Sequence, residues 1–85
     1  MRSRDLSQLE LEIVMHIANG RSLGEIALAV DRSRSYVAKQ ADRARRKTHA
    51  KTLPQLVSIV IASGVLEWQN DQRVLNGNSV DAVAN

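Results

Sequence analysis

The sequence predicts a small all-α domain built from four short helices. The prediction depends on repeated helix-start signals, on glycines where the helices should end, and on apolar residues at helical spacing between them. With 85 residues, the chain has the length of one domain. Its apolar residues are almost all aliphatic, since it has one Trp, one Tyr and no Phe. Such side chains suit short packed helices, whereas a β-sandwich this short would need more β-branched and aromatic residues in alternation.

Four helix-start signals are spread along the chain. Ser7–Glu10 and Ser22–Glu25 each place a Ser three residues before a Glu, which is the arrangement of a capping box. Thr52–Gln55 has a similar pattern, and its Pro54 suits the first turn of a helix. Ser33, which follows a polar turn, is the fourth candidate cap. Each cap contributes about 1 kcal/mol, which matters in a domain of marginal stability.

The expected helix ends agree with these starts. Gly20 and Gly64 fall where the first and last helices should end, in the position after a helix that glycine favours. Between starts and ends, apolar residues recur every three or four positions. The predicted helices therefore cover residues 8–19, 23–30, 34–48 and 53–63.

The C-terminal stretch has a different composition. Residues 67–85 are polar and rich in turn-forming residues, with only a weak apolar pattern. We therefore expect a folded domain over residues 1–66, followed by a mobile polar tail with at most one short helix.

Positive charge is concentrated in one part of the chain. The formal net charge is +3, but residues 32–51 contain eight of the twelve basic residues and a single acid, Asp42. This segment therefore has a charge of +7, and the rest of the chain −4. A run of charge can simply be a solvated helix face. Here it coincides with the predicted third helix, which favours a polyanionic partner.

A short helix, a short turn and a basic helix, over residues 23–48, are typical of a helix-turn-helix that binds duplex DNA. The major groove admits one α-helix, which must anchor one face on a core and expose the other to the bases. Val37, Ala41 and Ala44 form a suitable anchoring stripe.

The residues of this helix and of the turn before it divide by expected role. Those near the start of the helix should lie deepest in the groove, and we expect base contacts from Ser35, Tyr36, Lys39 and Gln40. The basic residues around them should contact phosphates, which gives affinity and orientation: Arg32, Arg34, Arg43, Arg46 and Lys47. The expected partner is double-stranded DNA.

Several stretches resemble the DNA-binding domain of LuxR/GerE-type transcription regulators. Leu6–Val14 is similar to that family's L-T-x-R-E-x-E-V-L opening, and Ile17–Ala27 to its I-A-x-G-x-S-x-x-E-I-A. The resemblance extends over about residues 6–66. Its further matches are Ser33 and Val37 (S-x-x-T-V), Lys47 (the later K-L) and Leu53–Leu66 (the fourth helix).

This resemblance implies a transcription regulator of bacterial, phage or plasmid origin, located in the cytoplasm. It implies that the third helix enters the major groove and that the fourth helix forms a homodimer contact. The helix over 53–63 is apolar on more than one side, which agrees with a second buried face. We therefore expect a dimer interface that includes Leu56, Ile59 and Val60.

The sequence also departs from the family pattern. Leu9 replaces the usual Arg, Asp31-Arg32 replaces Gly-Ile, and Gln40 replaces the His of the third helix, so the DNA target does not transfer. Two alternatives stay open. One is a truncated LuxR-like module that pairs with a full-length regulator and inhibits it. The other is a module like region 4 of bacterial sigma factors, which Ser33–Val37 and Arg43–Lys47 resemble.

No pattern in the sequence indicates an enzyme or a cofactor. The chain has no cysteine, which excludes a thiol nucleophile, a disulfide and a cysteine-based zinc site. His16 and His49 are far apart and lack a recognisable carboxylate arrangement around them. The longest apolar stretch, 56–66, is too short to span a bilayer. We therefore expect no catalytic residue, no metal, no small-molecule ligand and no membrane partner.

Overall fold

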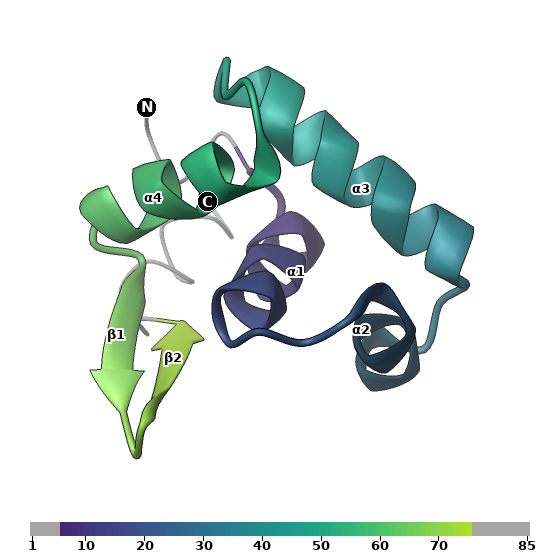
Figure 1. Cartoon of the computed structure of the whole chain (residues 1–85), viewed down its shortest axis with the longest axis horizontal. Helices are drawn as coiled ribbons and strands as arrows, with labels where there is room; N and C mark the ends of the chain where they lie inside the picture. Colours follow the sequence, from purple (N-terminus) through teal and green to yellow (C-terminus); the bar gives the residue numbers. More distant parts are fainter. Residues whose placement is uncertain (1–5, 76–85) are drawn as a thin grey trace.

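The computed structural model describes residues 6–75, which form a small, mostly helical domain. Figure 1 shows α1 near the middle, with α2 and α3 on one side of it and α4 and a two-stranded hairpin on the other. Each helix begins at the predicted residue and ends within one residue of the predicted end. The elements are α1 (Gln8–Ala18), α2 (Leu23–Val30), α3 (Arg34–Lys47), α4 (Leu53–Ala62), β1 (Leu66–Gln69) and β2 (Gln72–Leu75).

The predicted caps form, and this explains why the helix starts were predictable. Ser7 Oγ accepts the Glu10 N–H at 3.1 Å, while the Glu10 carboxylate accepts the Ser7 N–H at 2.7 Å. Ser22 and Glu25 form the same reciprocal pair at the start of α2. Each cap satisfies backbone N–H groups that have no partner within the helix. Gly20 has a positive φ of 80° after α1, as its predicted place at a helix end requires.

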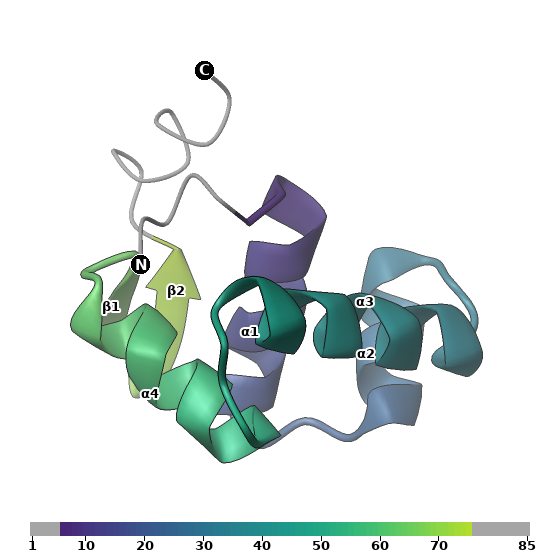
Figure 2. The ribbon, with the colours of Figure 1, turned by 90° about the horizontal axis from the view of Figure 1, so that it is seen from above.

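The core lies on two sides of α1. Leu11 and Val14 pack in a cluster that joins α1 to α4 and the hairpin, with Leu56 among its members. Ile13 packs in a second cluster with Ile26 and Val37, which joins α1 to α2 and α3. Figure 2 shows α1 between these two groups of elements. Helix α3 is therefore held on the rest of the domain through side chains of both α1 and α2.

The hairpin corrects two sequence predictions. Residues 67–75 were expected to belong to a mobile tail, but β1 and β2 pair antiparallel, with Leu66 opposite Leu75 and Trp68 opposite Arg73. Leu66 is buried and Leu75 packs against the same core cluster. The domain therefore extends beyond residue 66, and the class is mostly helical with a small sheet. Residues 76–85 of the predicted tail lie outside the described residues.

The hairpin is stabilised by the conformation of its turn and by a side chain at the end of α1. Asn70 and Asp71 adopt positive φ angles of 49° and 62°, the conformation that a two-residue hairpin turn requires and that Asn and Asp tolerate. Asn19, at the end of α1, accepts the Arg73 backbone N–H at 2.7 Å and donates to the Arg73 carbonyl at 2.9 Å. The side chain of one residue thus attaches β2 to α1.

Candidate nucleic-acid interface

Helix α3 presents one face to the core and the opposite face to solvent. Val37 and Ala44 are fully buried and Ala41 is nearly so, which confirms the anchoring stripe predicted from the sequence. The small alanines allow α3 to lie close to α1. The solvent side of the helix runs along the outside of the molecule (Figure 1).

The nine predicted DNA-contacting residues all lie on α3 or in the turn before it. Tyr36 and Gln40 are partly buried, so less of each side chain is available than the sequence analysis expected. The other seven are exposed: Arg32, Arg34, Ser35, Lys39, Arg43, Arg46 and Lys47. The structure thus brings the predicted site together along one helix.

The exposed basic residues differ in whether they already have an acidic partner. Arg34, Lys39 and Arg43 form no ion pair with any of residues 6–75. Their charges are therefore available to an external anion. Arg32 lies over the ring of Tyr36, with its guanidinium carbon 5.6 Å from the ring centroid. This cation–π contact holds Arg32 beside the start of α3.

Asp42 offsets part of the charge at the C-terminal half of α3. Its carboxylate pairs with Arg45 at 2.7 Å and with Arg46 at 3.1 Å. The hydrogen bond from Arg45, followed by the charges of the two arginines, lowers the pKa of Asp42, so the carboxylate is ionised at neutral pH. Arg45 also donates to the Ala50 carbonyl at 3.0 Å, which fixes the turn after α3. Arg46 is exposed but partly neutralised, so its contribution to an anion site is smaller than that of Arg43.

Lys47 has a contact that the sequence analysis did not predict. Its Nζ lies 2.8 Å from Oε1 of Glu10, a residue that is 1% exposed and that also caps α1. Lys47 therefore joins the end of α3 to the start of α1. The phosphate contact expected at this position stays a prediction, and a phosphate there would share the amine with the buried Glu10 carboxylate.

Glu10 remains ionised in spite of its burial. Burial is the largest single influence and raises the pKa of Glu10. The hydrogen bonds from Lys47 and from the Ser7 N–H, together with the Lys47 charge, outweigh it and leave the pKa below its ordinary value of 4.5. Oε2 of Glu10 is buried and has no hydrogen-bond partner among the described residues. The ionised form of the Glu10 carboxylate is thus stabilised mainly by its contact with Lys47.

An open hollow lies at the C-terminal half of α3. Its lining residues are Arg43, Arg46 and Lys47, all positively charged. Arginine side chains present several N–H donors that match the oxygens of a phosphate, and an ammonium group adds charge. The chemistry of this hollow fits a phosphate oxygen of a polyanion.

The structure contradicts most of the predicted dimer interface. Leu56 and Val60 are fully buried in the core of a single copy, so neither can contact a second copy while the domain is folded. Ile59 is partly buried and packs against the same cluster. Helix α4 is apolar on more than one side because it contacts α1, α3 and β1 within one chain. The additional apolar residues of α4, which suggested a dimer, thus pack against other elements of the same chain.

We expect Leu56→Ala to lower the free energy of unfolding by about 3 kcal/mol, because it leaves a cavity in the core. Urea unfolding followed by circular dichroism measures this loss. The matched control is Leu53→Ala on the same helix, where the side chain is 36% exposed and the expected loss is below about 1.5 kcal/mol. Equal losses for the two variants would contradict the packing of α4 described above.

Residues 6–75 contain neither a metal site nor a membrane-spanning helix. No group of three or more His, Asp or Glu side chains there could hold a metal ion. Within the same residues, no helix has both the length and the apolar character to cross a membrane.

The chain matches no protein-family model, no curated protein and no solved structure. The role of the exposed face of α3 is therefore inferred from its own residues and their geometry.

Proposed function

We propose that this domain binds double-stranded DNA as a small transcription regulator of the LuxR/GerE type. In this proposal α2 and α3 form a helix-turn-helix, and the solvent face of α3 enters the major groove. The observation that supports it most directly is the division of α3 into an apolar buried stripe and an exposed basic face. Three basic side chains on or next to that face, Arg34, Lys39 and Arg43, lack acidic partners among the described residues.

The length of α3 and the order of its residues support the same function. Its 14 residues correspond to a helix of about 21 Å, long enough to cross a groove about 12 Å wide. Arg32 and Arg34 lie at one end of the basic face, and Arg43 and Arg46 lie toward the other. Basic residues at both ends allow phosphate contacts on both sides of a groove.

The residues between these basic ends are the candidates for base contacts. Lys39 is exposed and can donate to the acceptor atoms of guanine. Gln40 can pair with adenine through its amide, although part of its side chain is buried. Ser35 and Tyr36 lie one turn earlier on the same side of α3 and can donate through their hydroxyl groups.

The affinity for duplex DNA should depend steeply on salt concentration. About four or five phosphate contacts per subunit predict a log–log slope near −4 for the binding constant against salt. Fluorescence anisotropy with a labelled random duplex, across a salt series, measures this slope. Weak binding that does not change with salt would contradict the proposal. It would favour the alternative of a module that pairs with a full-length regulator.

A further inference from the structure

The outer edge of β1 carries backbone groups that point away from the sheet. The hairpin has a two-residue turn, so Gln69 and Gln72 form its first hydrogen-bonded pair and Trp68–Arg73 is a non-hydrogen-bonded pair. The contacts of Arg73 agree with this, since its backbone N–H and carbonyl both bond outward to Asn19. By the same geometry, the N–H and carbonyl of Trp68 point outward from β1.

These two groups of Trp68 have no hydrogen-bond partner among residues 6–75. Figure 1 shows that β2 lies on the side of α1 and that β1 is the outer strand. An unpaired edge is a site for pairing with another strand, and natural edges are protected by a proline, charged side chains (lysine above all), a bulge or a very short strand. β1 is short, with four residues, and carries one charged side chain. Its sequence, Leu-Glu-Trp-Gln, contains neither a proline nor a lysine, and its register is regular.

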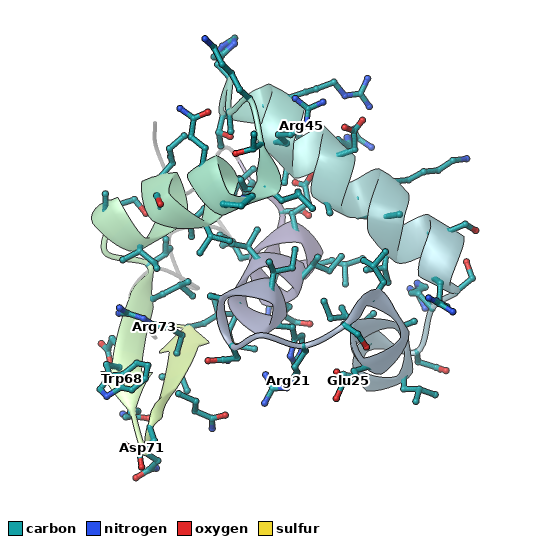
Figure 3. The ribbon with its side chains drawn as sticks, viewed as in Figure 1. Arg21, Glu25, Arg45, Trp68, Asp71 and Arg73 are labelled. Carbon is teal, nitrogen blue, oxygen red and sulfur yellow. The ribbon has the colours of Figure 1, made fainter. Side chains whose placement is uncertain are left out.

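A large aromatic side chain lies beside this edge. Trp68 is 63% exposed and is the single tryptophan of the chain. The guanidinium carbon of Arg73 lies 5.3 Å from the centroid of its ring. Figure 3 shows this pair on the hairpin, well away from Arg45 on α3. A large apolar ring next to unpaired backbone groups indicates a contact surface.

We propose that β1 pairs antiparallel with β1 of a second copy of this chain, on a two-fold axis at Trp68. Each Trp68 would exchange two backbone hydrogen bonds with Trp68 of the partner subunit, giving a four-stranded sheet. The two rings would then be neighbours on one face, each next to the Arg73 of its own chain. Glu67 would face Gln69 of the partner subunit, so no like charges would oppose each other.

This pairing leaves the basic face of α3 free. The hairpin and α3 lie at opposite ends of the molecule in Figure 1. The proposal does not depend on DNA binding, and it is tested without DNA.

Register-specific cross-linking tests the pairing directly, because the chain has no cysteine of its own. Glu67→Cys and Gln69→Cys are prepared as separate proteins and oxidised alone or mixed. In the proposed register, positions 67 and 69 of different copies have Cα atoms about 4.5 Å apart, within disulfide range, whereas two copies of position 67 lie about 7–8 Å apart or more. We expect the mixture to give at least about fivefold more disulfide dimer than either protein alone. Equal cross-linking with and without mixing, or none, would overturn the proposal.

The unmodified chain supplies a second measurement. Because Trp68 is the single tryptophan, its emission should shift to the blue as protein concentration rises, together with dimer formation in sedimentation equilibrium. Trp68→Glu retains a cross-strand partner in Arg73 but places two acids face to face, and should weaken dimerisation about tenfold or more. Leu28→Glu is the control, since Leu28 is 86% exposed on α2 and should leave the dimer intact. A chain that is monomeric at all concentrations, or equal effects of the two substitutions, would contradict the pairing.

Discussion

The double substitution Lys39→Glu/Arg43→Glu should weaken binding to duplex DNA by about a hundredfold or more at 100 mM salt. Both side chains are exposed on the solvent face of α3 and form no ion pair with residues 6–75. Reversing them therefore changes two attractive contacts with phosphates or bases into two repulsive ones. Neither residue packs on the core, so circular dichroism and thermal unfolding should stay close to those of the parent.

A matched control separates this effect from the change in total charge. Arg21→Glu/Lys51→Glu alters the net charge by the same amount but lies off the exposed face of α3. Figure 3 shows Arg21 on the side of the molecule that faces away from α3. We expect the control to lose less than about tenfold in affinity, through long-range electrostatics alone. Equal losses for the two double variants would mean that α3 has no special role in binding.

Lys47→Met should lower the free energy of unfolding by about 3 kcal/mol at pH 7, because it leaves the Glu10 carboxylate buried without its ionic partner. Methionine keeps most of the length and apolar character of the lysine chain. Glu10→Gln is the informative comparison. Its amide oxygen can still accept the Ser7 N–H, and Lys47, which is one-third exposed, can turn to solvent. We expect the loss in Glu10→Gln to be near 1 kcal/mol.

The pH dependence of stability distinguishes this mechanism from simple loss of packing. In the parent, the pKa of Glu10 is lower in the folded state than its ordinary value of 4.5. The unfolded chain therefore binds more protons, and the stabilisation is present above pH 4.5 and is lost as pH falls through the lowered pKa. In Lys47→Met, burial without the lysine should raise that pKa, so protonation should stabilise the variant. Urea unfolding between pH 3 and 7 should show the two curves converging toward acid, whereas a constant difference would indicate lost packing alone.

The helices were predictable because their signals are local. Ser7, Ser22, Ser33 and Thr52 each act on a backbone N–H three residues away, so sequence spacing alone determines the starts. The hairpin was missed because its two strands have only four residues each, too few to show a clear alternation. The pair Asn70-Asp71 was the one signal that could have indicated its turn.

The candidate site was predicted less completely than the helices. The role of each of its side chains depends on contacts with residues that are distant in the sequence. Glu10 and Lys47 are 37 positions apart, and nothing in either local pattern indicates that they meet. Likewise, the apolar positions of α4 show that Leu56 and Val60 are covered, but not whether their own chain or a second copy covers them. A sequence gives the pattern of burial on one helix, whereas the identity of the neighbour depends on the whole fold.

Asn19 has a consequence for how far the sheet can grow. An asparagine side chain has a donor group and an acceptor group side by side, and here both bind the backbone of β2. An incoming strand would have to displace them, so β2 is closed to further addition. Pairing through β1 then stops at two chains, because each copy has one usable edge. A protein with both edges open could instead assemble without limit into fibres. A single amide at the end of a helix thus sets a finite size on any assembly made through this sheet.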